Sequence, residues 1–364
     1  MTGRSTTLKE ERVDARLIAL GWDPAWEALR SINPFADLEP ARVALQHRGG
    51  YVLYGQGREQ AATISGRLRH EARGVGELPA VGDWVLAADG VIQAVLPRRT
   101  SFSRKAVLAF EEQVAAANAD VAFVVAALSG SPNLRSLERY LTVAYESGAE
   151  PAVILTKADL CADVAGAVAA VREIAPATAV HAVSVPEGTG LAIFDAYCRP
   201  GRTVVFLGPS GVGKTTLLNA LEGGDRPTAA IREDGRGRHT TTHRELVLIE
   251  GRGMVLDTPG MRELQLWDAD AGLAAVFSDI DALARACRFG DCSHAAEPGC
   301  AVRSAIETGA LAAERYASYR KLEREELHVT KKRDALARSE EKRQYRIFAR
   351  RQRRAGGHGL DQRD

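Results

Sequence analysis

Length, composition and charge indicate a folded protein with more than one domain. The chain has 364 residues, of which 45% are hydrophobic and 26% are charged, values that exclude disordered and collagen-like proteins. It is too long for one core of ordinary size, so two or three domains are expected. The net charge of +1 hides a C-terminal end rich in Lys and Arg, which indicates a polyanionic partner.

The sequence predicts a cytoplasmic protein without membrane contact. It contains no run of about eighteen apolar residues, and its first residues, MTGRSTTLKEERVDAR, lack the apolar core of a secretory signal. Cysteines in such a reducing compartment ligate metals more often than they form disulfides.

Residues 1–40 are treated as an N-terminal extension without an assigned function. They contain one short helical pattern, from Leu17 to Leu20. The sequence GWDP at positions 21–24 follows it and is typical of a turn.

Residues 41–100 are expected to form an OB-fold-like β-barrel that binds RNA. Short apolar runs alternate there with glycines at strand spacing: ARVALQ, GYVLYG, AATISGRL, GDWVLAA and GVIQAVL. Five such strands in a short segment suit the OB-fold, whose face commonly binds oligonucleotides. An SH3-like barrel, or a packing module without a ligand, is the alternative.

Residues 101–268 change to an α/β pattern. Near-continuous apolar runs, namely ADVAFVVAAL, EPAVILT, TAVHAVS, RTVVFLG and GMVLD, end at polar loops. Helical stretches separate them, such as Arg135 to Ser147 and Ala162 to Ile174. Strands buried on both faces with helical crossovers predict a mostly parallel sheet. Ligands of such sheets bind at the carboxyl ends of the strands.

One of these strands leads into a phosphate-binding loop. The pattern G-x-x-x-x-G-K-[ST] stands between the strand Thr203 to Leu207 and the helix-forming TLLNAL. Its residues, with the threonine that follows, are Gly208, Pro209, Ser210, Gly211, Val212, Gly213, Lys214, Thr215 and Thr216. Glycines let backbone N–H groups approach a phosphate. Lys214 adds positive charge, and the Thr215 hydroxyl can ligate Mg²⁺.

Two later segments complete this predicted phosphate and Mg²⁺ site. The motif DTPG ends the strand GMVLD, so that Asp257 can face the Mg²⁺ shell and the N–H of Gly260 can reach the γ-phosphate. The run GRGRHTTT at 235–242 fits a switch segment with a Mg²⁺-binding threonine. Thr241 is our choice for that ligand, although Thr240 or Thr242 could serve. A plain solvated loop is the alternative for the whole run.

A second motif predicts guanine as the base. Thr156, Lys157, Ala158 and Asp159 match [NT]-K-x-D after the strand EPAVILT. The Asp159 carboxylate can accept from guanine N1–H and the 2-amino group, whereas adenine offers neither donor there. The stem of Lys157 can cover the base plane. In the loop after TAVHAVS, the backbone N–H of Ser184 could donate to guanine O6.

The order of these motifs predicts a circular permutation. Base-recognition loops follow the phosphate loop in most GTPases, but here they precede it. A sheet tolerates this rearrangement because joining the old termini and opening new ones preserves the packing. The second switch, near 258–262, then leads almost directly into the C-terminal domain, so the nucleotide state could set that domain's orientation.

Residues 269–325 are expected to form a helical zinc-binding domain. The spacing Cys287-x4-Cys292-x-His294-x5-Cys300 supplies three thiolates and an imidazole, the ligand set of a closed structural zinc site. Free buried thiols are the alternative. Cys161 and Cys198 are isolated and are expected to be small buried hydrophobic residues.

Residues 326–364 form a predicted basic tail. Acidic residues are mixed in early, and the bases concentrate toward Arg350 to Arg354. This favours contacts with nucleic-acid phosphates over a merely solvated helix.

Together these motifs resemble one known family. The segments TKAD, GPSGVGKTT, GRHTTT, DTPGMRE and CRFGDCSHAAEPGC, behind a β-rich module, are similar to the RsgA (YjeQ) family of small-ribosomal-subunit biogenesis GTPases. PAVGDW, LPRRTSFSRK, NLRSLERYL and EPGCAV also look like family segments, and the resemblance spans about 40 to 325. It implies a multidomain α/β protein with an OB-fold, a permuted P-loop GTPase domain and a helical zinc domain.

The resemblance also implies a function and its ligands. Family members clamp a late-stage 30S subunit, contact 16S rRNA near the decoding region, and hydrolyse GTP to favour their own release. The expected cofactors are GTP or GDP, Mg²⁺ and one structural Zn²⁺ per chain. Met261 stands after DTPG, where Ras-like GTPases often carry a water-orienting Gln, so slow hydrolysis is expected of the isolated protein. His239 is the hypothetical residue that the subunit would bring toward the γ-phosphate.

Two other functions stay open from the sequence. One is a GTP-gated rRNA-binding module or RNA chaperone, in which hydrolysis only resets the state. The other is a P-loop ATPase or kinase, against which the motif at 156–159 argues. A monomer is the default oligomeric state.

Overall fold

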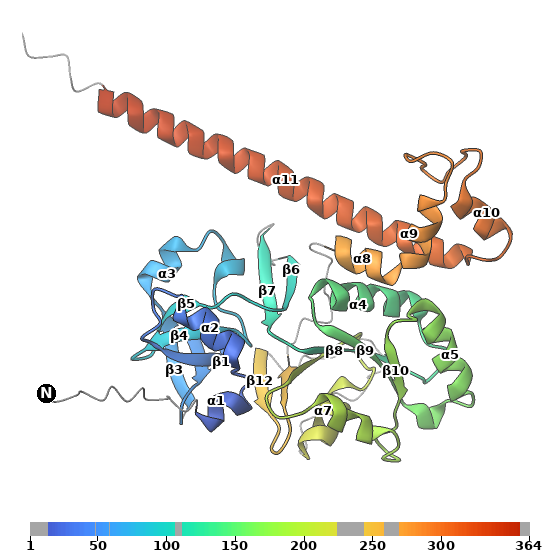
Figure 1. The fold of residues 1–364 in the computed structure, drawn as a ribbon, viewed down its shortest axis with the longest axis horizontal. Helices are drawn as coiled ribbons and strands as arrows, with labels where there is room; N and C mark the ends of the chain where they lie inside the picture. The colour runs from blue at the N-terminus through green and yellow to red at the C-terminus, as the bar shows by residue number, and fades with distance from the viewer. Residues whose placement is uncertain are drawn as a thin grey trace, which may run out of the picture.

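One continuous sheet joins the two β-containing parts of the protein (Figure 1). The structure is a computed structural model that describes residues 14–47, 49–57, 59–105, 111–223, 244–257 and 269–356. Within these ranges the sheet has 11 strands in the order β10-β9-β8-β11-β13-β12-β1-β2-β3-β5-β4, and β1 also pairs with β4. That last pairing closes the N-terminal part into a barrel.

The barrel confirms the predicted small all-β module. Its strands are β1 (Glu39–His47), β2 (Gly50–Tyr54), β3 (Glu59–Ile64), β4 (Trp84–Ala88) and β5 (Val91–Val95). The short helices α3 (Gly66–Glu71) and η1 (Val75–Glu77) lie between β3 and β4. Buried and partly buried residues alternate along β2 and β5, as expected for strands with one face on the barrel interior.

Two N-terminal helices pack on the barrel. They are α1 (Ala15–Ala19) and α2 (Pro24–Ser31). Trp22 and Trp26 pack against Trp84 of β4, and the Trp22 and Trp84 rings meet edge to face at 4.8 Å. The predicted turn separates the two helices, with Gly21 at φ +90°. Its last two residues also start α2, because the Asp23 carboxylate accepts the N–H groups of Ala25 and Trp26 while proline occupies the first helical position.

The second part of the sheet is mostly parallel, as predicted. Its parallel strands are β8 (Val121–Ala127), β9 (Glu150–Thr156), β10 (Ala179–Ala182), β11 (Thr203–Leu207) and β13 (Met254–Asp257). Phe123 and Val125 face one core cluster and Val124 faces the other, so β8 is buried on both sides.

Helices cover both faces of this parallel sheet. The longer ones are α4 (Leu134–Glu146), α5 (Val164–Ile174) and α7 (Lys214–Glu222), and the short ones are η2 (Ala158–Leu160), η3 (Leu191–Ile193) and α6 (Phe194–Tyr197). Leu141 of α4 and Val171 of α5 belong to one core cluster, whereas Leu217 of α7 and Phe194 of α6 belong to the other. This is a doubly covered α/β domain.

Two strand pairings were not predicted. One is the separate antiparallel pair of β6 (Ser101–Lys105) with β7 (Glu112–Ala117). The other is the pairing of β12 (Arg244–Leu248) with both β13 and β1, which fuses the barrel to the parallel sheet. The pairing of β1 with β12 joins residues far apart in the chain, so no local pattern reveals it.

The C-terminal part is helical, as predicted. Its helices are α8 (Asp270–Val276), α9 (Ser278–Arg285), α10 (Ala301–Glu307) and α11 (Ala313–Gly356). Figure 1 shows α8 against α4 and the far half of α11 projecting away from the body. The helix passes without a break through 325, where we expected the domain to give way to a tail. No helix in the described part of the chain has the length and apolar character needed to cross a bilayer.

A buried ion-pair network docks this part onto the parallel sheet. Glu138 of α4 is fully buried and pairs with Arg315 of α11 at 2.9 Å. Arg315 also pairs with Asp279 of α9 at 2.7 Å. One arginine therefore links α4, α9 and α11, and removing it would leave the buried Glu138 with Arg135 of its own helix as the remaining ion-pair partner.

We predict that Gly82→Ala destabilises the protein by about 3 kcal/mol or more. Gly82 has φ +92°, and an added Cβ would lie 2.0 Å from the carbonyl oxygen of Ala117, so the backbone of β7 must shift. The measurement is the free energy of unfolding from a urea titration.

The matched control is Gly57→Ala. Gly57 has φ +83°, but among the described residues no atom lies within 4 Å of the added Cβ. This control suffers only the backbone strain, about 1 to 2 kcal/mol. Equal losses in the two variants would contradict the close approach of Gly82 to β7.

Candidate functional site

The phosphate loop lies between β11 and α7, at the carboxyl edge of the parallel sheet. Gly208 follows β11 with φ +140°, and a Cβ there would lie 2.4 Å from the carbonyl oxygen of Val125 on β8. Gly213 caps α7 with φ +98°. Glycine is therefore required at these two positions by close approach and by backbone conformation.

Lys214 is folded across this loop. Its Nζ donates to the carbonyl oxygens of Gly208 at 2.7 Å and Pro209 at 2.6 Å. Thr215 and Thr216 follow in the first turn of α7 and are half-buried. The Lys214 ammonium and the N-terminus of α7 thus lie at the loop, an arrangement that suits a phosphate.

The predicted guanine motif contacts the phosphate loop directly. The Thr156 hydroxyl donates to the carbonyl oxygen of Val212 at 2.5 Å. Lys157 adopts a left-handed conformation with φ 59°, and its Nζ donates to the carbonyl oxygen of Gly211 at 3.0 Å. The segments predicted to bind the base and the phosphates are therefore in contact, although the first precedes the second in the chain.

The acid of the guanine motif is oriented by a serine. The Ser184 hydroxyl donates to the Asp159 carboxylate at 2.6 Å, and Ala158 N–H donates to the carbonyl oxygen of Val183 at 3.1 Å. The two base loops after β9 and β10 are thus brought together. The N–H of Ser184 already donates to the carbonyl oxygen of Thr189 at 3.0 Å, which competes with the donation to guanine O6 that we expected.

Asp257 lies at the same sheet edge. It is half-buried and is the last residue of β13, the strand that pairs in parallel with β11. This places the predicted Mg²⁺-shell acid beside the phosphate loop. The other predicted residues of this half of the site, His239, Thr241 and Gly260, lie outside the described residues, as do Thr258 and Met261.

The predicted zinc ligands converge in the structure. The ligand atoms of Cys287, Cys292, His294 and Cys300 all lie within 4.8 Å of one another. His294 Nδ1 is 3.5 Å from Cys287 Sγ and 3.4 Å from Cys300 Sγ, and these two sulfurs are 4.0 Å apart. Around a tetrahedral Zn²⁺, a nitrogen and a sulfur ligand would be about 3.5 Å apart and two sulfur ligands about 3.8 Å apart. The geometry therefore fits a four-ligand zinc.

The chemistry of the donor set also favours a cation. Burial raises the pKa of Cys287, but N–H groups at Val302 and Ala301 and the neighbouring thiols outweigh burial, so its pKa lies below the usual value. Burial and the other two thiols raise the pKa of Cys292 to about 11. Three thiols this close cannot all be thiolates unless a cation binds between them.

Glu297 holds the ligand loop and was missed by the sequence analysis. Its carboxylate accepts the Ser293 hydroxyl and the N–H groups of Ser293, Ala295 and Ala296. These bonds, the Ser293 hydroxyl first, lower its pKa to about 2. His294 stands within this loop at φ 60°. The acid in the run SHAAEPG is a signal that could have been noticed, because short loops are often closed by a carboxylate.

Fold and site together define a circularly permuted P-loop GTPase with a barrel before the nucleotide-binding domain and a Cys₃His cluster after it. A family model described as RsgA GTPase matches residues 95–267. Small ribosomal subunit biogenesis GTPase RsgA of Opitutus terrae is 46% identical over 353 residues, which cover 91% of this chain and 96% of the relative. The chain therefore belongs to the RsgA GTPase family, a family of GTP-hydrolysing enzymes.

Other relatives and solved structures agree with this family. Small ribosomal subunit biogenesis GTPase RsgA 2 of Vibrio parahaemolyticus is 42% identical and covers 84% of this chain and 85% of its own length. The crystal structure of YjeQ from Thermotoga maritima matches with a TM-score of 0.58 and 25% identity, covering 79% of this chain and 98% of that one. YloQ, described as a circularly permuted GTPase, matches with a TM-score of 0.55 and 25% identity over 81% of this chain and 96% of its own.

Zinc binding is expected to require the Cys₃His cluster and not the cysteines outside it. We predict about one zinc per purified chain, as expected for a closed four-ligand site. Cys292→Ser is expected to lose most of the metal during dialysis against a weak chelator and to unfold at a lower temperature. Elemental analysis and a thermal scan measure both effects.

Cys161→Ser is the control, because Cys161 is half-buried and is not part of the cluster. It should retain zinc like the unchanged protein. Full zinc retention by Cys292→Ser would contradict the proposed ligand set.

Proposed function

We propose that this enzyme hydrolyses GTP to GDP and phosphate in a cycle coupled to late maturation of the small ribosomal subunit. One observation supports it most. The guanine motif and the phosphate loop are held together by the bonds from Thr156 to Val212 and from Lys157 to Gly211. A site that binds a base and a polyphosphate at this fixed separation suits a purine nucleoside triphosphate.

The nucleotide site divides into groups with separate tasks. Backbone N–H groups of the loop and the charge of Lys214 would bind the β- and γ-phosphates. Thr215, Asp257 and Thr241 would hold Mg²⁺ directly or through its waters, and the N–H of Gly260 would meet the γ-phosphate. Bound Mg²⁺ supplies neutralisation of the charge that develops during phosphoryl transfer.

Base selection would come from Asp159. Ser184 donates to one oxygen of this carboxylate, which leaves the other oxygen for the guanine N1–H and 2-amino donors. Because the Ser184 N–H is engaged by Thr189, the next N–H along the loop, that of Val185, is the better donor for guanine O6.

The partner is proposed to be the 30S subunit and its 16S rRNA. The relatives of this chain are named for small-subunit biogenesis. The barrel offers an OB-type face, and Lys and Arg outnumber Asp and Glu along the projecting part of α11, from 331 to 356. We propose phosphate contacts along this helix, a monomeric protein, and a cytoplasmic site of action.

Hydrolysis by the isolated protein is proposed to be slow. Met261 stands where a side chain could otherwise orient the attacking water. His239 is proposed to supply this help once the subunit orders the switch segment. Release of the factor would then follow hydrolysis.

The base assignment is tested with Asp159→Asn. We expect GDP affinity to fall about a hundredfold or more, because two bonds to a charged acceptor are lost. Xanthosine diphosphate should bind better to the variant than to the unchanged protein, since its 2-carbonyl can accept from the new amide. Calorimetric titration with both nucleotides and with ADP measures this, and unaltered GDP binding would refute the role of Asp159.

The activity is tested by GTP turnover of zinc-loaded protein with and without 30S subunits. We expect stimulation of at least about a hundredfold, the scale of general acid–base help. Lys214→Ala should lose about a hundredfold or more of the stimulated rate, and ATP should not replace GTP. Unchanged slow turnover with 30S present would favour a GTP-gated RNA-binding module instead.

The same assay examines His239→Ala, which should bind GTP normally and lose most of the stimulation. Full stimulation in this variant would remove His239 from the mechanism.

A further inference from the structure

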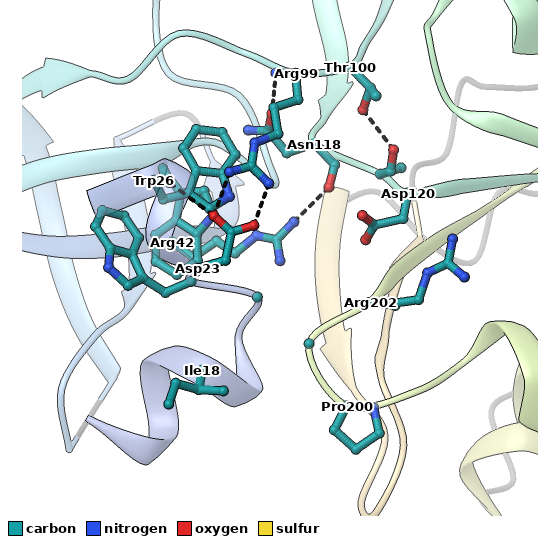
Figure 2. A pocket seen from close by; sticks show the side chains of 15 residues that line it. Ile18, Asp23, Trp26, Arg42, Arg99, Thr100, Asn118, Asp120, Pro200 and Arg202 are labelled. Carbon is teal, nitrogen blue, oxygen red and sulfur yellow. Dashed lines mark hydrogen bonds and ion pairs between the residues drawn. The ribbon is translucent and has the colours of Figure 1, made fainter. Parts of the chain in front are cut away.

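Arg42 of β1 connects four segments that come from different parts of the chain. Its Nε donates to the carbonyl oxygen of Gly82 at 3.2 Å. Its Nη1 donates to the carbonyl oxygen of Leu20 at 2.5 Å and to the sulfur of Met254 at 3.5 Å. Its Nη2 donates to the carbonyl oxygen of Asn118 at 2.8 Å, a bond drawn in Figure 2. The N-terminal helices, the barrel, the turn before β8 and the start of β13 thus meet at one guanidinium.

The charge of Arg42 is not matched by a contacting acid. The side chain is 2% exposed, and no carboxylate among the described residues forms an ion pair with it. Burial lowers the pKa of Arg42 to about 10, and the more distant charges of Asp120 and Asp83 offset only part of that effect. A buried charge bound only by neutral groups is costly. The Arg42 guanidinium, however, is a rigid planar group whose N–H donors hold several acceptors at defined angles.

Apolar packing joins the barrel to the parallel sheet at this junction, since one core cluster contains Val43 and Trp84 of the barrel and Met254 of β13. A cavity of about 350 Å³ lies beside Arg42 (Figure 2), lined by charged groups that include Asp23, Arg99, Asp120 and Arg202. Arg99 pairs with Asp23 at 2.6 Å and lies 4.1 Å from the Trp26 ring, which secures α2 at the rim of the cavity. The bonds of Arg42 therefore add directional contacts to the apolar packing between the barrel and the parallel sheet.

The strand that carries Arg42 touches both strands that border the predicted switches. Leu45 and Gln46 of β1 pair with Glu245 and Arg244 of β12, which begins directly after the segment with the predicted Mg²⁺ ligand Thr241. Arg42 reaches the start of β13, which ends at Asp257. Both switch strands are therefore in direct contact with β1.

We propose that Arg42 is a positioning residue that couples the orientation of the barrel to the switch strands β12 and β13. A partner bound to the barrel would then alter the position of Asp257 and the rate of GTP hydrolysis. Such coupling is reciprocal, so the bound nucleotide also alters the barrel. The effect of a ribosomal partner rests on the proposed function, whereas the effect of the nucleotide does not.

Hydrogen exchange followed by mass spectrometry tests the nucleotide arm on the full chain. We expect exchange in the barrel strands β1 and β4 to differ about fivefold or more between a non-hydrolysable GTP analogue and GDP, the lower end of ordinary coupling. In Arg42→Lys this difference should vanish, because an ammonium keeps the charge but cannot hold four separated acceptors. A loss of structure alone would raise exchange equally in both nucleotide states.

Arg98→Lys is the matched control. Arg98 is also a largely buried arginine of the barrel, but its hydrogen-bond acceptors, Asp83, Gly76 and Leu78, all belong to the barrel. This variant should keep the nucleotide-dependent difference. An unchanged difference in Arg42→Lys, or an equal loss in both variants, would overturn the proposal.

Met254→Leu keeps the proposal testable if Arg42→Lys does not fold. The change conserves volume and removes only the contact of Arg42 with β13. It should reduce the nucleotide-dependent difference, and an unchanged difference would overturn the coupling to β13.

GTP turnover measured with 30S subunits tests the effect of a ribosomal partner. Arg42→Lys should keep its basal rate and its KM for GTP while the stimulated rate falls on the order of tenfold to a hundredfold, as for a modest misplacement of a catalytic group. Stimulation equal to that of the unchanged protein would refute the partner arm. If the unchanged protein itself is not stimulated, the proposed partner is wrong, and hydrogen exchange alone then decides the role of Arg42.

Discussion

The parallel pairing of β9, β8, β11 and β13 is the constraint on which the nucleotide site depends. Parallel strands end at one edge of the sheet, so the loops that follow them meet there whatever their order in the chain. This is how Asp159 after β9, Gly208 after β11 and Asp257 at the end of β13 come to share one site. Circular permutation changes where the chain begins and leaves this edge intact.

The permutation has a mechanical consequence at the other side of the sheet. The strand β12, which follows the first predicted switch, is shared between the parallel sheet and the barrel. The barrel is thus an extension of the nucleotide-binding sheet, and Arg42 adds directional bonds across the junction. A buried charge without a contacting acid is expensive, and its geometry gives a physical reason for keeping it.

The zinc domain is joined to the same body by different means. Arg315 links Glu138 of α4 to Asp279 of α9, so the Cys₃His cluster is held relative to the parallel sheet by a buried ion pair. Any change in the orientation of this domain relative to α4 must break that pair or move it as a whole.

The barrel strands and the parallel strands could be predicted from the sequence, because apolar periodicity is a local property. Motif spacing, also local, predicted the site residues, of which the four of the Cys₃His cluster converge in the structure. We missed two local signals that the sequence contains, namely the pair Asp23 and Pro24, which starts α2, and the Glu297 carboxylate, which closes the zinc loop. The tertiary structure alone decided the pairing of β1 with β12 and the partners of Arg42. These contacts join residues up to 212 positions apart, and such pairings depend on the packing of whole elements and leave no signature in any short stretch of chain.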